Sequence, residues 1–325
     1  MKKLLSLLLA LLMLSVSLIS LASCNDAKTD GEINVTTLNG TTGFGMAPLM
    51  KENSQGTTSN KYNFEVQTDP SIVLAGLING SIDIAALPTN AAANAYNKTN
   101  GGVQIIAINT LGVLYLVTNN IDVSSFNDLE GKTIYCPAQN PFFITKYLVE
   151  ANNLSNKITI DSSTYATADA LRAAVIAGNV DYAVLPEPMV TIAKSSNATL
   201  KTTLNFTNEW NKVSNGKQLV QGCVVVRTEF AHRYPGSVKE FLKEYKSSIE
   251  ALNSDPATNS AYIKEFGIFA NDKVAAKAIP NCNIAYLDGS EMKAAMSGFL
   301  EAMYSVAPAS IGNTIPNDNF YYENK

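Results

Sequence analysis

The chain has 325 residues, a length that suits two domains of ordinary size. Hydrophobic residues make up 46% and charged residues 16%, so the chain can bury a core and is not disordered. The net charge is −4 and basic tracts are absent, which disfavours nucleic acid as a partner. A single histidine, His232, and only three arginines disfavour a histidine metal site, a Ser-His-Asp triad and an arginine cluster around phosphate.

The N-terminal segment reads as a targeting signal. Lys2 and Lys3 precede an apolar run over residues 4–19, which predicts a secretory signal over residues 1–23. Leu21-Ala22-Ser23-Cys24 resembles the bacterial lipobox, which implies cleavage before Cys24 and diacylation of that cysteine; the alternative is an uncleaved membrane helix. Residues 24–31 then form a tether. We expect a body held by two acyl chains at the outer face of the bacterial cell membrane.

An internal duplication sets the expected architecture. Residues 78–88 and 176–186 share the pattern aliphatic-x-Gly-x-aliphatic-Asp-x-Ala-x-Leu-Pro at an offset of 98 residues. Each copy predicts a helix end, a glycine turn with positive φ, and a short buried strand that ends at proline. The preceding helices are expected over residues 70–79 and 167–177.

The same offset recovers the start of each half. A strand over residues 33–38 is followed by a loop, 39–45, and by a helix from Met46. In the second half a strand over 133–136 leads through the loop 137–140 into a helix over 141–153, with proline at its first position. Alternating strands and helices predict a parallel-dominated sheet covered on both faces.

Two stretches rich in β-branched residues, 105–118 and 218–227, predict strands that cross between the halves. Apolar residues at helical spacing predict a long helix over 238–252, and three shorter helices should follow. These three are expected over residues 259–265, 272–278 and 290–305. We therefore predict an α/β fold of two doubly wound lobes joined by two crossover strands. The first lobe would hold residues 32–112 and 227–325, and the second residues 113–226.

Together, the lipobox, the duplicated α/β halves, the double crossover and the helical C-terminal region resemble a type II solute-binding lipoprotein of an ABC importer. The segments Asn39 to Met46, Ala86 to Asn90 and Leu185 to Pro188 resemble more narrowly the nitrate, sulfonate, taurine and pyrimidine-precursor binding group. The resemblance implies capture of a small polar solute between two lobes and its delivery to membrane permease subunits. It implies a monomer without a cofactor, a metal or a nucleic-acid partner.

Ligands of doubly wound sheets bind outside the carboxyl ends of the strands, and two candidate loops lie in the first half. Thr41, Thr42 and Gly43 offer hydroxyls and close backbone approach, although the loop fits a plain glycine-rich turn as well. Thr89 and Asn90 follow the second strand. Thr89 can also cap the helix over 90–97, which is compatible with ligand contact.

The second half contributes two more loops. Gln139 and Asn140 begin a helix in which Phe142 can stack on a planar ligand or pack in the core. Glu187 lies between two prolines after a buried strand; it either accepts hydrogen bonds from a ligand amine or ring N–H, or is a solvated helix-start residue. Asn109, with Thr110 and Gln221, either lines the cleft floor or satisfies backbone groups at the crossovers. Trp210 fits core packing and ligand stacking equally.

None of these loops contains arginine or lysine. The sequence therefore favours a neutral or amine-bearing polar solute, such as a nitrogen heterocycle, over a sulfonate or nitrate. We expect no enzyme: the fold relatives that make a pyrimidine use a site histidine, whereas His232 lies outside every candidate loop. A surface ligand sensor remains the alternative, because capture and sensing would use the same lobes. Cys136, Cys223 and Cys282 are expected as buried thiols, with a disulfide between two of them left open.

Overall fold

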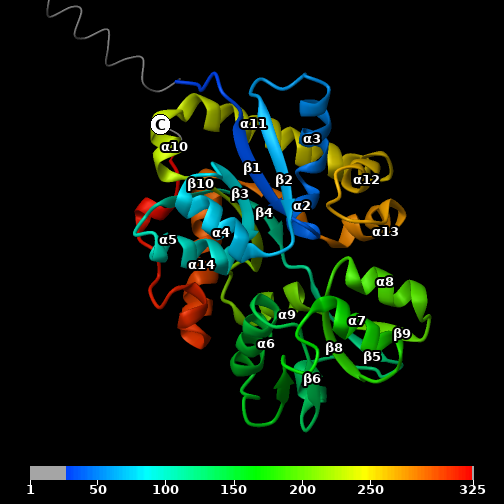
Figure 1. The fold of residues 1–325 in the computed structure, drawn as a ribbon. Coiled ribbons are helices and arrows are strands. Elements are labelled where there is room, and N and C mark those ends of the chain that lie inside the picture. The colour runs from blue at the N-terminus through cyan, green and yellow to red at the C-terminus, as the bar shows by residue number, and fades with distance from the viewer. Residues whose placement is uncertain (1–26, 324–325) are drawn as a thin grey trace, which may run out of the picture.

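The computed structural model describes residues 27–323, which form two α/β lobes joined at a narrow waist (Figure 1). The expected signal segment 1–23, the lipidation residue Cys24 and the start of the tether lie outside the described residues. Within residues 27–323, no helix combines the length and apolar content that crossing a bilayer requires.

The first lobe is built on a six-stranded sheet with strand order β11-β4-β10-β3-β1-β2. The strands are β1 (Ile33–Leu38), β2 (Tyr62–Gln67), β3 (Ile84–Pro88), β4 (Val103–Leu111), β10 (Val220–Arg227) and β11 (Ile284–Leu287). Alternate residues of each strand face opposite sides of the sheet, and most residues of β1, β3, β4 and β10 are buried on both sides. Ile84 and Ala86 belong to the core that holds side chains of α3 (Ala47–Ser54) and α11 (Pro235–Ser254). Ala85 and Leu87 belong to the core that holds side chains of α5 (Thr89–Lys98) and α14 (Gly289–Val306).

The second lobe has a five-stranded sheet with strand order β7-β6-β8-β5-β9. Its strands are β5 (Leu114–Asn119), β6 (Thr133–Tyr135), β7 (Thr159–Asp161), β8 (Tyr182–Pro186) and β9 (Leu200–Asn205). The duplicated segments occupy equivalent places, because β3 and β8 each follow a helix and a turn and each end at proline. The turn glycines Gly80 and Gly178 have φ of 81° and 76°, which confirms the prediction of positive φ at both positions.

The expectation of parallel-dominated sheets is wrong. The duplicated strands are parallel, since β1 pairs in parallel with β2 and β3, and β6 with β7 and β8. Of the remaining strands, three run against them: β10 is antiparallel to β3 and β4, β11 to β4, and β5 to β8 and β9. A strand that enters a lobe from the other lobe must start at the edge where the first strands end, so it runs in the opposite direction.

Thirteen α-helices of the described residues surround the two sheets (Figure 1). In the first lobe they are α2 (Thr41–Phe44), α3 (Ala47–Ser54), α4 (Pro70–Asn79), α5 (Thr89–Lys98), α10 (Thr228–Arg233), α11 (Pro235–Ser254), α12 (Pro256–Glu265), α13 (Asp272–Ala278) and α14 (Gly289–Val306). In the second they are α6 (Asn140–Ala151), α7 (Ala168–Ile176), α8 (Met189–Ser196) and α9 (Phe206–Val213). Short 3-10 turns lie at Phe126–Leu129, Ile279–Asn281, Pro308–Ile311 and Asp318–Phe320.

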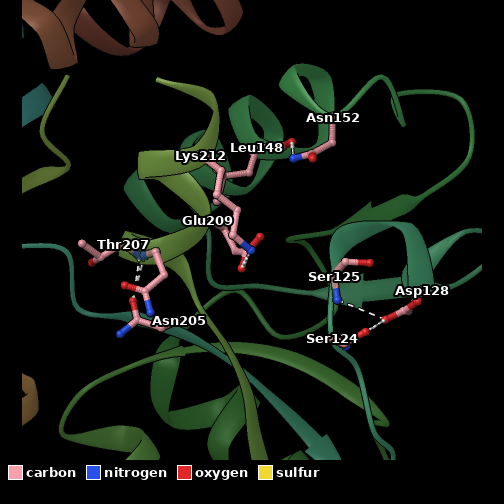
Figure 2. A network of polar contacts seen from close by, with 10 residues as sticks. Ser124, Ser125, Asp128, Leu148, Asn152, Asn205, Thr207, Glu209 and Lys212 are labelled. Carbon is pink, nitrogen blue, oxygen red and sulfur yellow. Dashed lines mark hydrogen bonds and ion pairs between the residues drawn. The ribbon is translucent and has the colours of Figure 1, made fainter. Parts of the chain in front are cut away.

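Short polar side chains begin several of these helices, as the sequence patterns suggest. Asp69 accepts a hydrogen bond from the Ser71 amide at the start of α4, and Thr167 accepts one from the Ala170 amide at the start of α7. Figure 2 shows the same device near the waist, where Asn205 accepts from the Thr207 amide at 2.9 Å to begin α9. These caps place the helix starts next to the strand ends from which a ligand would be reached.

The first crossing between the lobes lies at Gly112 and Val113, between β4 and β5. The Gly112 carbonyl accepts from Asn283 Nδ2 and Thr207 Oγ1, and the Val113 amide donates to Gln221 Oε1 at 2.7 Å. Gln221 therefore satisfies a backbone group at the crossover, one of the two roles expected for it. Elements of both lobes therefore hold this crossing in place.

The second crossing lies earlier in the chain than expected. Residues 220–226 were assigned to the second lobe, but β10 pairs with β3 and β4 and so lies within the sheet of the first lobe. The chain therefore returns to the first lobe between α9 and β10. The physical reason is that β10 fills the place between β3 and β4, which do not pair directly.

Trp210 is a packing residue. Its ring is fully buried, with its centroid 4.5 Å from that of Tyr147 in α6 and 6.0 Å from that of Phe299 in α14. Its indole Nε1 donates to the Lys217 carbonyl at 2.7 Å. Because α14 also packs on the first sheet, Trp210 ties the second lobe to a helix of the first.

The three cysteines of the described body are buried free thiols. Burial raises the pKa of Cys136 to about 12, so this side chain remains a protonated thiol at neutral pH. The expectation of small buried thiols is confirmed, and Cys136, Cys223 and Cys282 form no disulfide.

Candidate functional site

A cavity of about 930 Å³ lies between the lobes and is lined from both sides. The first lobe contributes the loop after β1, the end of β2 and its flank, and the segment between α12 and α13: Asn39, Gly40, Thr41, Thr42, Val66, Thr68 and residues 266–271. The second contributes the start of α7, the end of β8 and the start of α8: Ala168, Asp169, Arg172, residues 186–189 and Ile192. The cavity thus opens at the carboxyl ends of strands, where ligands of such sheets bind.

The wall from the first lobe carries Thr41 and Thr42, as predicted. Their segment forms a one-turn helix rather than a plain loop, and it is fastened at both ends. The Gly40 amide donates to the Ile268 carbonyl at 3.1 Å, and Asn109 Nδ2 donates to the Thr42 carbonyl at 3.0 Å. The two threonines are therefore held in a fixed place beside the segment 266–271.

Gly43 supports this wall from behind. It is buried and does not line the cavity. A Cβ atom at this position would lie 2.1 Å from the Leu38 carbonyl oxygen, far inside van der Waals contact. The glycine is required for the close approach of two backbone segments, which is a packing role; a direct ligand contact stays a prediction.

Glu187 places a carboxyl group at the wall of the second lobe. The residue is 4% exposed; its amide donates to the Val113 carbonyl at 3.0 Å, and its Oε2 accepts from the Thr191 amide at 3.0 Å. Burial raises the pKa of Glu187, while the hydrogen bond from Thr191 opposes that shift. This burial excludes a solvated residue, but the hydrogen bond from Thr191 in the first turn of α8 shows that Glu187 acts at a helix start. Contact between Glu187 and a ligand stays a prediction.

The carboxyl group of Glu187 also acts on its neighbours. Burial and, secondly, the Glu187 charge raise the pKa of Tyr115 to about 12, and the same two causes raise the pKa of Cys282 well above its usual value. Tyr115 donates to the Asn281 carbonyl across the waist at 2.9 Å. Glu187 therefore lies close to a contact that joins the lobes.

Arg172 lines the cavity and was not among the predicted residues. It lies in α7, with Nη1 3.0 Å from Asp169 Oδ1 and 3.5 Å from Met189 Sδ. Most of the predicted residues lie in loops after strands or at helix starts, whereas Arg172 lies inside a helix. A comparison of the two duplicated halves could have identified Arg172, because the 98-residue offset aligns it with the apolar Leu74. A cation in place of a leucine indicates a side chain with a different task.

Several predicted residues do not line this cavity. The Thr89 hydroxyl donates to the Val220 carbonyl at 2.9 Å and does not cap α5, so the capping prediction is wrong. The reason lies in the tertiary structure, because β10 places the Val220 carbonyl within reach of the Thr89 hydroxyl. Asn109 Nδ2 donates to the Thr42 carbonyl and to the Tyr245 hydroxyl. Asn109 thereby supports the cavity wall through Thr42, and contact of Thr89 or Asn109 with a ligand stays a prediction.

The remaining predicted residues lie at the starts of α5 and α6. Asn90 and Asn140 are buried, and the side-chain oxygen of each has no hydrogen-bond partner among the described residues. Gln139 is exposed, and Phe142 is half-buried against Phe143, with ring centroids 5.6 Å apart. Buried polar atoms without partners are uncommon in folded proteins, so the two asparagines keep their place as candidate ligand contacts.

The single histidine lies away from the cleft. His232 is exposed on α10 and lines a separate recess with residues such as Asn317 and Asn319. The groups that meet in the cavity are one guanidinium, two carboxyl groups, hydroxyls, amides and apolar side chains. This set can hold a small polar molecule by hydrogen bonds and charge.

Comparison with known proteins agrees with this description. A family model described as an ABC transporter, phosphonate, periplasmic substrate-binding protein matches residues 45–268, more than half of the chain. No curated protein sequence matches significantly.

Solved structures share the whole fold. An ABC transporter protein from Parabacteroides distasonis has a TM-score of 0.77 and 25% identity, covering 91% of this chain and 100% of that one. The aliphatic sulphonate binding protein SsuA from Escherichia coli has a TM-score of 0.72 and 14% identity, covering 91% and 93% of the two chains. SsuA from Xanthomonas axonopodis pv. citri, bound to MOPS, has a TM-score of 0.64 and 15% identity, covering 90% and 97%.

These neighbours confirm the predicted type II periplasmic-binding-protein fold. Two lobes, a cleft between them and a matching family model lead to one conclusion: the chain belongs to the periplasmic substrate-binding proteins of phosphonate-type ABC transporters.

Proposed function

We propose that the protein is the extracytoplasmic substrate-binding lipoprotein of an ABC importer. It captures a small polar solute between its lobes as a monomer and delivers it to the permease. The observation that carries this proposal is the cavity itself, which both lobes line and in which the buried carboxyl group of Glu187 meets Thr41 and Thr42. A lipid on Cys24 would keep the body at the outer face of the membrane.

The solute has two recognisable ends. Glu187 favours a hydrogen-bond donor, an amine or ring N–H, as the sequence suggested. The sequence-based preference for a neutral or amine-bearing solute also rested on loops without arginine, and Arg172 in the cavity changes that premise. A guanidinium suits an oxyanion, in line with the phosphonate family model and with the sulfonates named for two neighbours. The proposed solute therefore carries an oxyanion and an N–H donor.

Mass spectrometry of the solute that co-purifies with residues 24–325 tests the proposal directly. The expected result is a small molecule with a phosphonate or sulfonate group and an amine or ring nitrogen, bound without turnover. Glu187→Ala should weaken its binding by about 1–3 kcal/mol, because a buried hydrogen-bond partner is lost. Glu291→Ala, at an exposed position, is the matched control. A solute that binds equally to both variants would place the binding site elsewhere.

Membrane attachment has its own test. In cells, Cys24→Ala should prevent lipidation, so the protein should leave the membrane fraction. Cys136→Ala changes the same residue type in the buried body and should leave the protein at the membrane. Retention of the Cys24→Ala protein at the membrane would contradict the anchor.

A further inference from the structure

The described part of the tether is fastened to the first lobe. The Gly236 amide donates to the Ala27 carbonyl at 2.9 Å, and the Thr29 amide donates to Ser237 Oγ at 3.1 Å. Gly236 and Ser237 are buried residues in the first turn of α11. Residues 27–29 and the start of α11 therefore form a clamp, whereas the sequence alone predicted only a tether over residues 24–31.

The two hydrogen bonds contribute more to this clamp than its ion pair does. Ser237 is fully buried, so release of Thr29 would leave the Ser237 hydroxyl without its donor inside the protein. Lys28 Nζ lies 3.4 Å from Glu240 Oε1, but the Lys28 side chain is half exposed, and such pairs contribute little.

The clamp shortens the link between the proposed lipid and the body. From Cys24 to Ala27 the chain can span no more than about 10 Å, because an extended chain gains about 3.5 Å per residue. Without the clamp the link would continue to the start of β1 at Ile33 and could span about 30 Å. The contacts with α11 thus decide how far the body can move from its anchor.

The clamp lies at the end of the first lobe that is opposite the cleft. The tether leads into the start of β1, whereas the cavity begins beyond the other end of this strand, at Asn39. The six residues of β1 span about 20 Å. Figure 1 shows the start of the described chain at the outer end of the first lobe, with the second lobe on the far side of the waist.

We infer, on the basis of the proposed lipid anchor, that the end of the first lobe formed by α10 and the start of α11 is the membrane-facing surface of the protein. The clamp keeps this end within about 10 Å of the lipidated cysteine, so its partner is the layer of lipid headgroups. The cleft and the second lobe lie on the side away from the bilayer, open to the medium from which a solute arrives.

The charges at this end do not by themselves draw it to a membrane. Exposed side chains of both signs are present, with Arg233 and Lys239 on the helices and Asp30 and Glu32 in the tether. The short link and the clamp therefore orient the body, and salt, which screens charge attraction, should not disturb this orientation.

Energy transfer to a membrane dye measures which end lies near the bilayer. The full chain is produced in cells that attach the lipid and is placed in phosphatidylcholine vesicles that contain an acceptor-labelled lipid. A donor dye is attached to Arg233→Cys, beside the clamp, or to Asn156→Cys, just before β7 at the outer end of the second lobe; both positions are exposed. The three cysteines of the body are buried, so the introduced cysteine is the one that reacts.

A second pair of variants tests the clamp. Lys28→Glu with Thr29→Pro places a negative charge opposite Glu240 and removes the amide that donates to Ser237. Both changes lie before the first strand, so the fold of the lobes is kept. Lys61→Glu makes the same charge change at another exposed lysine of the first lobe and is the matched control.

Transfer from Arg233→Cys should be about twofold higher or more than from Asn156→Cys, because the cleft and both sheets separate the two positions. The ratio should be the same in high salt and in the Lys61→Glu background. In the clamp variant the ratio should fall toward one, because the longer link lets the body turn.

Equal transfer from the two positions in lipidated protein, or stronger transfer from Asn156→Cys, would overturn the inference. An unchanged ratio in the clamp variant, or a ratio that falls to one in high salt, would also overturn it, because the clamp would then not set the orientation. If mass spectrometry finds no lipid on Cys24, the proposed anchor fails and the inference fails with it, while the co-purified solute still tests capture.

Discussion

The two walls of the cleft arise from a duplicated sequence but differ in chemistry. The wall of the second lobe carries Arg172 and Glu187, held by α7, β8 and α8, whereas that of the first carries hydroxyls and amides. The duplication preserved the strand ends, where a ligand is reached, and allowed the side chains placed there to diverge.

The walls are also supported differently. The threonines of the first lobe depend on a close backbone approach at Gly43 and on the Asn109 amide. Glu187 depends on backbone hydrogen bonds, one of them to the crossing at Val113. Close packing and hydrogen bonds together therefore maintain the first wall, whereas backbone hydrogen bonds hold the buried Glu187 in the second.

The largest effect on stability is expected at Gly43, where the wall of the first lobe has no space for a side chain. Gly43→Ala should lower the free energy of unfolding by about 3 kcal/mol, because its Cβ would meet the Leu38 carbonyl. Gly56→Ala is the control: its φ is 69° with nothing within 4 Å, so only backbone strain of about 1 kcal/mol is expected. Urea denaturation measures both, and equal losses would contradict the packing role of Gly43.

A smaller effect is expected from the buried carboxyl of the second wall. The pKa of Glu187 is raised in the folded protein, so folding favours the protonated form. The stability that this group contributes is present below its ordinary pKa of 4.5 and is lost as pH rises through the folded-state pKa. Glu187→Gln stays neutral, so its melting temperature relative to the wild type should rise between pH 4 and pH 7.

Glu291→Gln, at an exposed position, is the matched control and should follow the wild type across this range. Scanning fluorimetry in a buffer series makes the comparison. If the difference in melting temperature between Glu187→Gln and the wild type stays constant with pH, protonation of the buried Glu187 carboxyl does not affect stability.

The smallest effect concerns Asp169, the ion-pair partner of Arg172. Asp169 is 69% exposed, so its pair with Arg172 should contribute no more than about 0.5 kcal/mol to stability. Asp169→Asn should leave the melting temperature nearly unchanged. It should strengthen binding of 2-aminoethylphosphonate, a probe with an oxyanion and an ammonium group, about twofold, because a competing negative charge beside Arg172 is removed. Weaker probe binding, measured by calorimetry, would mean that Asp169 is needed to orient the guanidinium.

Local patterns in the sequence predicted most elements and their bounds. Residues 70–79 and 272–278 were predicted as helices and are α4 and α13, and residues 33–38 are β1. Turn glycines, helix-start prolines and apolar periodicity act within a few residues, so they can be read without a fold. The same patterns pointed to Thr41, Thr42 and Glu187 as neighbours of the cleft, because strand ends meet there.

The sequence alone therefore determined the duplication, the alternation of strands and helices, and the strand-end loops. Only the tertiary structure decided that β10 joins the first sheet, that Thr89 bonds to Val220 instead of capping α5, and that Arg172 lines the cleft. Each of these depends on segments far apart in the chain, and Arg172 lines the same cavity as Thr41 and Thr42 because the chain crosses from the first lobe to the second between them. A local sequence pattern cannot predict such contacts, because the residues that make them lie more than a hundred positions apart in the chain.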